Sequence, residues 1–157
     1  MNSDLSPLKR LEEAGWLPLG HYERKEAQEA VNKEYALIHS LERELKPMLP
    51  VQYVDTLQEA ATFCYKLCTA IGSRPVKKLV VSTRIVPRTA SACYVPWEKA
   101  IHFNYRCFHI STLIHETAHH VHFVEQYGGE MHGREYCEIV KLLYDVALTL
   151  FNNKCGI

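Results

Sequence analysis

Apolar residues recur every three or four positions along two stretches in the first half of the chain, and this spacing predicts two amphipathic helices. The longer one covers residues 22–45, where charged side chains separate the apolar ones. The other covers residues 56–71, with Thr56 as a candidate N-cap and Gly72 as the stop. A short helix is also predicted over residues 5–14.

The pattern changes in the middle of the chain. Residues 78–85 are short, apolar and rich in β-branched side chains, which is typical of a strand. Residues 91–95 and 100–104 read as two more strands on either side of a turn at Pro96. Together they predict a small three-stranded meander sheet.

Helical periodicity then returns for the rest of the chain. One helix is predicted from about Ser111 to the Gly128-Gly129 pair, and an apolar helix follows over residues 133–151. Helices and strands are therefore segregated along the chain, which favours the α+β class.

The helix after Ser111 contains an HExxH motif, formed by His115, Glu116 and His119. Residues four apart lie on one face of an α-helix, so both imidazoles can reach one ion. Zinc commonly takes such nitrogen ligands. Glu116 is placed to contact a water at the metal without binding the metal itself, as in a metal hydrolase.

A catalytic zinc site also needs a third protein ligand. The candidates follow the motif closely in sequence: His120, His122, His132, Glu125, Glu130 and Glu135. His120 lies about 100° around the helix from His119 and points elsewhere. His122 is nearer the helix face that carries His115 and His119, but one helix rarely surrounds an ion with three of its own side chains.

His132 is the preferred third ligand, because the glycine pair lets the chain reverse. From Tyr127 back to the level of His119 the helix spans about 12 Å. The extended chain from Tyr127 to His132 covers roughly 16–18 Å, which is enough to return.

Composition and charge narrow the class of protein. The 157 residues carry 18 basic and 18 acidic side chains, and 47% are hydrophobic, as in an ordinary globular protein. Residues 61–110 hold eight basic side chains and one acidic one, whereas both flanking regions are acidic. This basic segment is a candidate DNA contact, and the equally weighted alternative is that it neutralises the acidic flanks within one fold.

The six cysteines include no CxxC pair, so reduced, buried thiols are expected rather than a zinc ribbon or disulfides. The first residues lack the features of a secretory signal, and no apolar run is long enough to span a bilayer. A cytoplasmic protein with no membrane contact is expected.

The motif, the spacer and the His132-Gly133-Arg134-Glu135-Tyr136 segment together resemble the SprT-like zinc metalloproteases, whose pattern is HExxH followed by HGxE and an aromatic residue. The upstream segments Ser91–Tyr94 and Ile101–Asn104 are similar to two strands that border the cleft in that family. The resemblance covers roughly residues 56–150. It departs from the family pattern at Ala90 or Ser91, where glycine is usual, and the chain contains no cysteine-rich zinc ribbon.

The resemblance implies a zincin-like domain over residues 56–157, following an N-terminal helical extension over 1–55. In such a domain a three-stranded sheet, an active-site helix and a return helix build the site. His115, His119 and His132 would bind one Zn²⁺ and Glu116 would be the catalytic base. Members of the family are similar in cleaving DNA-associated proteins, so a protein or peptide substrate is implied.

Further residues have candidate roles in peptide hydrolysis. Tyr136 and Arg134 are candidate oxyanion donors, and Glu135 is a candidate partner for a ligand histidine. The strand through Ser91, Ala92, Cys93 and Tyr94 could hold an extended substrate by backbone pairing.

Two alternatives to this interpretation stay open. One is an ImmA-type regulator protease, in which an acid such as Glu130 or Glu135 replaces His132 as the third ligand. The other is a non-catalytic, metal-stabilised protein-binding module that contacts its partner through the acidic helix 22–45.

Overall fold

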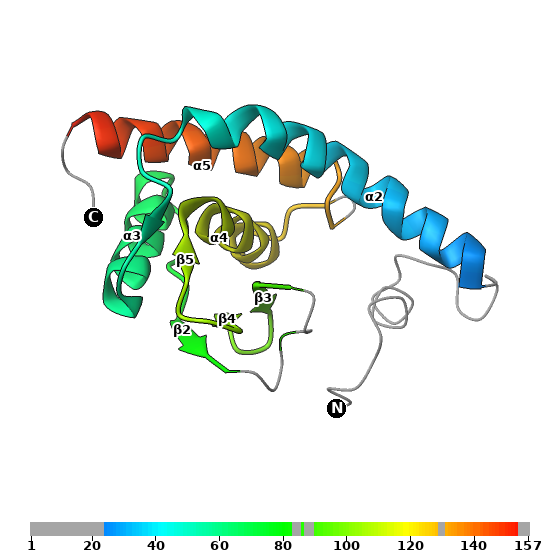
Figure 1. Cartoon of the computed structure of the whole chain (residues 1–157), viewed down its shortest axis with the longest axis horizontal. Coiled ribbons are helices and arrows are strands. Elements are labelled where there is room, and N and C mark those ends of the chain that lie inside the picture. The colour runs from blue at the N-terminus through cyan, green and yellow to red at the C-terminus, as the bar shows by residue number, and fades with distance from the viewer. Residues whose placement is uncertain (1–23, 83–85, 87–89, 129–130, 154–157) are drawn as a thin grey trace.

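Helix α4, Ile110–Val124, is the central element of the fold (Figure 1). It packs against helix α5, Arg134–Asn152, on one side and against a small sheet on the other. The helix predicted over 5–14 lies outside the described residues. The computed structural model describes residues 24–82, 86, 90–128 and 131–153.

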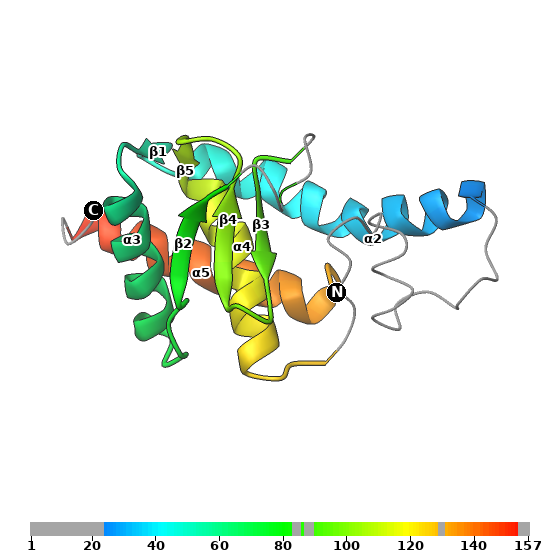
Figure 2. The same ribbon diagram turned by 90° about the horizontal axis from the view of Figure 1, so that it is seen from below.

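Two further helices cover the core, and both were predicted. Helix α2, Arg24–Leu45, runs beside α5 and continues into a short 3-10 turn, η1, Lys46–Met48. Helix α3, Leu57–Ala70, packs against α4 and α5 (Figure 2). Ile38, in the second half of α2, is buried in the same core as residues of α3, α4 and α5. Helix α2 is therefore part of the packed structure.

The start of α3 confirms the predicted cap. Thr56 has extended backbone angles, and its Oγ1 accepts a hydrogen bond from the amide of Glu59 at 3.0 Å. The same hydroxyl also donates to the Glu59 carboxylate at 3.0 Å, so the side chains of Thr56 and Glu59 are joined at the start of the helix. After the helix, Gly72 takes a left-handed φ of 72°, a conformation that costs glycine little.

The main sheet has the order β2-β4-β3, with strands β2, Lys78–Val81, β3, Ala92–Val95, and β4, Ala100–Phe103. β3 and β4 form the predicted antiparallel hairpin, but β2 pairs in parallel with β4. The predicted meander order is therefore wrong. β4 is buried at all four positions, and a central place in the sheet explains this burial.

A second pair of strands was not predicted. β1, Tyr53–Val54, pairs antiparallel with β5, Phe108–His109. The amide of Ile110 also donates to the carbonyl of Gln52 at 2.8 Å. This short ribbon joins the segment before α3 to the first residue of α4 and so fixes where the central helix begins.

The α+β class is confirmed: helices and small sheets share one core. The largest fully buried side chains come from α2, α3, α4, α5 and the strands around them, and include Ile38, Phe63, Phe103, Leu113 and Tyr144. Cys64, Cys68 and Cys137 are buried free thiols, as predicted, whereas Cys107 is exposed. Among the described residues, no helix is long and apolar enough to cross a membrane.

We expect Thr56→Ala to lower the free energy of unfolding by about 1 kcal/mol, because the first turn of α3 loses its hydroxyl cap. Urea unfolding followed by circular dichroism measures the change. Thr62→Ala, at an exposed position inside the same helix, is the matched control and should not destabilise the protein. Equal losses in the two variants would contradict the assignment of the cap.

Candidate metal centre

His115 and His119 lie one turn apart on α4, as the HExxH spacing predicted, with ring centroids 5.0 Å apart. Both rings are half-buried. The helix continues without interruption to Val124, and its start is held by the β1–β5 ribbon. Local helical geometry therefore places two imidazoles on one face without further constraint.

His132 joins them from the segment that precedes α5. Its Nε2 lies 2.9 Å from the Nε2 of His119, and its ring centroid is 5.3 Å from that of His115. One nitrogen from each of the three rings lies within 4.8 Å of the others. The predicted convergence of His115, His119 and His132 is confirmed.

This donor set fits a transition metal such as zinc. All three donors are imidazole nitrogens, which suit zinc, copper, iron or nickel and not the oxygen-seeking magnesium or calcium. Two nitrogens on one tetrahedral zinc are about 3.3 Å apart, because each bond is about 2.0–2.1 Å long. The His119–His132 separation of 2.9 Å is close to that value.

The charges of these rings also suit metal binding. Burial, together with the neighbouring His115, lowers the pKa of His132 to about 3. Burial, with His132 and His115 close by, likewise holds the pKa of His119 well below its usual value. Both rings are therefore neutral near pH 7, and a neutral imidazole is the form that binds a metal.

His115 has a partner that the sequence did not reveal. Its Nδ1 lies 3.0 Å from a carboxylate oxygen of Glu42, on α2. A carboxylate only accepts, so Nδ1 carries the hydrogen and Nε2 keeps its lone pair for a metal. Burial works to lower the pKa of His115, but the bond to Glu42 and the charges of Glu116 and Glu42 outweigh it, and the pKa is raised.

Glu42 is only 8% exposed, although its side chain ends in a polar carboxyl group. One signal for it was present in the sequence: Glu42 follows the buried Ile38 by four residues, on the apolar face of α2. A carboxylate on that face needs a buried partner. The neighbouring Tyr35 also faces the site, with its ring centroid 4.3 Å from that of His132.

Glu116, the candidate base, is 7% exposed and lies against strand β3. The backbone N–H of Tyr94 donates to its Oε1 at 3.1 Å. Burial raises the pKa of Glu116 to about 7, while His115 and the Tyr94 amide act in the opposite direction. A carboxyl group with a pKa near 7 can both take up and release a proton at neutral pH.

The structure places the other candidate residues around this centre. Tyr136 is fully buried; its ring stacks on His119 with centroids 4.4 Å apart, and its hydroxyl donates to the carbonyl of His115 at 2.9 Å. A contact between this hydroxyl and an oxyanion would require that bond to break. Arg134 and Glu135 are exposed on the first turn of α5.

The candidate substrate segment lies at a sheet edge. Ala92, Cys93 and Tyr94 belong to β3, which pairs with β4 on one side, and Ser91 precedes the strand with an exposed side chain. The carbonyl of Ser91 accepts a bond from the amide of Asn104.

Three other histidines of the described residues, His102, His120 and His122, lie outside the cluster. His120 points away from it and bonds the carbonyl of Arg74, and His122 bonds the carbonyl of Gly128. His102 pairs with Glu98.

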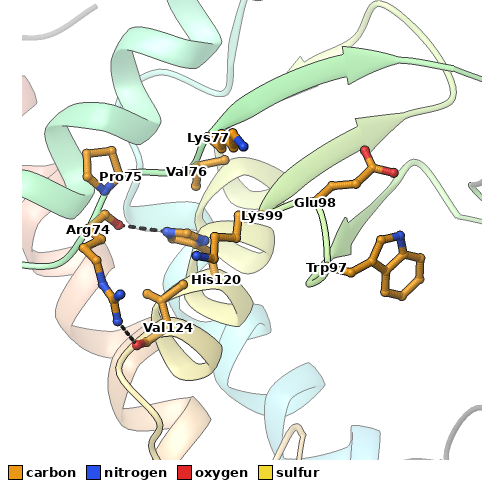
Figure 3. A pocket seen from close by; sticks show the side chains of 9 residues that line it. All are labelled: Arg74, Pro75, Val76, Lys77, Trp97, Glu98, Lys99, His120 and Val124. Atoms are coloured by element: carbon orange, nitrogen blue, oxygen red, sulfur yellow. Dashed lines mark hydrogen bonds between the residues drawn. The ribbon is translucent and has the colours of Figure 1, made fainter.

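A hollow of about 450 Å³ lies at the end of the sheet, beside the last turns of α4 (Figure 3). It contains none of the three converging imidazoles and is separate from the metal centre. Among the residues that line the hollow, His120 is the one closest in sequence to the three clustered histidines. Its walls are formed by Arg74, Pro75, Val76, Lys77, Trp97, Glu98, Lys99, His120 and Val124.

Comparison of the chain with protein-family models, with curated proteins and with solved structures gives no match. Any function must therefore be inferred from the residues of the site and their geometry.

We expect the purified protein to bind zinc stoichiometrically and His132→Ala to lose it, because two imidazoles on one helix do not complete the site. His122→Ala is the matched control, since His122 bonds Gly128 outside the cluster. Elemental analysis after dialysis measures the metal. Full zinc retention by His132→Ala would exclude His132 from the ligand set.

We also expect Glu42→Gln to weaken zinc binding roughly 10- to 100-fold, because the carboxylate that orients His115 is replaced by a weaker acceptor. Competition with a chromogenic chelator measures the affinity. Glu44→Gln, on the exposed side of the same helix, should bind zinc as the wild type does. Equal affinities in all three proteins would show that Glu42 does not support the metal.

Proposed function

We propose that this protein is a zinc-dependent endopeptidase with a zincin-like, SprT-like arrangement of its site. The observation that carries the proposal is the convergence of His115, His119 and His132 beside the buried carboxylate of Glu116. Three imidazoles and an adjacent acid are the components that a hydrolytic metal site requires.

His115, His119 and His132 are the residues that hold the metal. When bound, zinc supplies Lewis acidity, which polarises a carbonyl group and lowers the pKa of water towards about 7. Glu42 keeps His115 in the tautomer whose Nε2 is available. Tyr136 packs beneath His119 and so limits the rotation of that ring.

Glu116 is the proton carrier of the proposed reaction. Its carboxylate takes a proton from the attacking water and passes it to the nitrogen of the leaving amine. Burial raises the pKa of Glu116 to about 7, so this carboxyl group can both accept and release a proton near neutral pH. The Tyr94 amide holds Oε1 in place during these steps.

A protein or peptide segment in extended form is the proposed substrate. Strand β3 is at the edge of its sheet, so an extended chain can pair with the outward-facing backbone groups of this strand other than the Tyr94 amide, which bonds Glu116. Glu116 is bonded to the same strand, and a chain on this edge therefore passes beside the base. DNA-associated proteins in the cytoplasm are the proposed targets, supported by the cations Arg74, Lys77 and Lys99 around the hollow.

The alternatives are weaker on the described residues. An ImmA-type site needs an acid as third ligand, but the cluster has His132 and leaves Glu135 exposed outside it. Glu130 lies outside the described residues. A non-catalytic, metal-stabilised module would have no use for a buried, desolvated carboxylate beside the imidazoles, since burying such a group is unfavourable.

We expect Glu116→Gln to reduce cleavage of fluorescein-labelled casein at least about 100-fold, because the side chain no longer carries a proton. Zinc content and thermal unfolding should stay as in the wild type. Glu138→Gln, at an exposed position on α5, is the matched control and should cleave normally. Wild-type cleavage by the zinc-loaded Glu116→Gln protein would exclude Glu116 as the base.

A further inference from the structure

We propose that Tyr94 and His120 are positioning residues, which clamp strand β3 to helix α4 and thereby hold the carboxylate of Glu116 in its working orientation. The catalytic meaning of this clamp rests on the proposed function. The clamp itself is a set of contacts that the described residues make with one another.

The first part of the clamp is the side chain of His120. It is only 1% exposed and is bonded at both ring nitrogens. Nε2 lies 2.8 Å from the carbonyl oxygen of Arg74, as Figure 3 shows, and Nδ1 lies 2.7 Å from the hydroxyl of Tyr94. A carbonyl only accepts, so Nε2 carries the hydrogen, and Nδ1 accepts a hydrogen bond from the Tyr94 hydroxyl.

The second part is Tyr94, which makes hydrogen bonds to two residues of α4. Its hydroxyl donates to His120, and its backbone N–H donates to Oε1 of Glu116. Glu116 and His120 are four residues apart, so they lie on one face of the helix about one 5.4 Å turn apart. Tyr94 therefore spans one turn of the helix: its backbone N–H contacts Glu116, and its side chain contacts His120.

The clamp acts on a short strand at the edge of the sheet. β3 has four residues, and its ladder of hydrogen bonds runs to β4 on one side only. The clamp joins it to α4, and His120 joins α4 in turn to the segment before β2. If the hydroxyl bond is lost, β3 can shift relative to α4, and the amide no longer aligns the buried carboxylate. Small displacements of a catalytic group can lower the reaction rate strongly.

The residues of the clamp are distinct from the ligands. His120 follows His119 directly but projects about 100° away from it around the helix. Removing its contacts should therefore leave the three imidazoles in place and should leave zinc affinity unchanged. A loss of rate at constant zinc affinity separates this role from support of the metal.

The test is Tyr94→Phe, which removes one hydroxyl and keeps the ring. Tyr65→Phe, at an exposed position on α3, is the matched control. With a quenched fluorescent peptide derived from a cleavage site in casein, we expect kcat to fall about tenfold in Tyr94→Phe, as for one lost hydrogen bond. KM and zinc affinity should stay near the wild-type values, and Tyr65→Phe should match the wild type.

A second set of variants tests His120. His120→Leu should lower kcat at least as much as Tyr94→Phe, and His120→Gln should recover part of the loss, because its amide group can donate to Arg74 and accept from Tyr94. Combining Tyr94→Phe with His120→Leu should cost no more than His120→Leu alone, since both remove the same bond. If the losses of kcat in the two single variants were fully additive in the double variant, Tyr94 and His120 would not be coupled.

A readout that needs no activity is hydrogen exchange at the amide of residue 94, followed by NMR in the zinc-loaded protein. We expect this amide to be protected in the wild type and in Tyr65→Phe, and to exchange faster in Tyr94→Phe. Fast exchange in the wild type, or an unchanged kcat in Tyr94→Phe, would overturn the proposal. If the wild type cleaves no peptide but its protection is lost in Tyr94→Phe, the clamp stands and the endopeptidase proposal fails.

Discussion

Three imidazoles gathered around one point are the constraint on which the rest of the structure depends. Two of them, His119 and His132, bring their nitrogens to 2.9 Å, a separation that two charged rings would not tolerate. Burial keeps both rings neutral, and packing supplies that burial: α5 and Tyr136 on one side, α2 with Tyr35 on the other. The central place of α4 follows, since it must present one face to the sheet and another to α5.

Two carboxylates flank this cluster of imidazoles and have different roles. Glu42 bonds an imidazole and sets its tautomer, whereas Glu116 bonds a backbone amide and keeps a raised pKa. The difference arises from their partners. Glu42 contacts an imidazole nitrogen on α4, whereas Glu116 is desolvated against a strand, and this burial raises its pKa. Similar side chains are thus suited to support a metal in one place and to carry protons in the other.

Local patterns predicted most of the helices and the ligands. The i,i+4 spacing of His115 and His119 needs only helical geometry, and the return of the chain to His132 needs only its length. The partners of these residues depend on tertiary packing instead. Glu42 reaches His115 because α2 lies across the site, and no spacing reveals that placement. The order of the sheet was missed for the same reason, since a hairpin does not specify which of its strands β2 will join.

The contact between Glu42 and His115 would also connect helix α2 thermodynamically to a metal bound by the three imidazoles. If a docked α2 raises the affinity of the site for an ion, then the bound ion stabilises the docking of α2 by the same free energy, because coupling between two equilibria is reciprocal. Undocking of this helix would therefore weaken the binding of such an ion. Occupancy of the centre would in this way depend on the position of a helix far from it in the sequence.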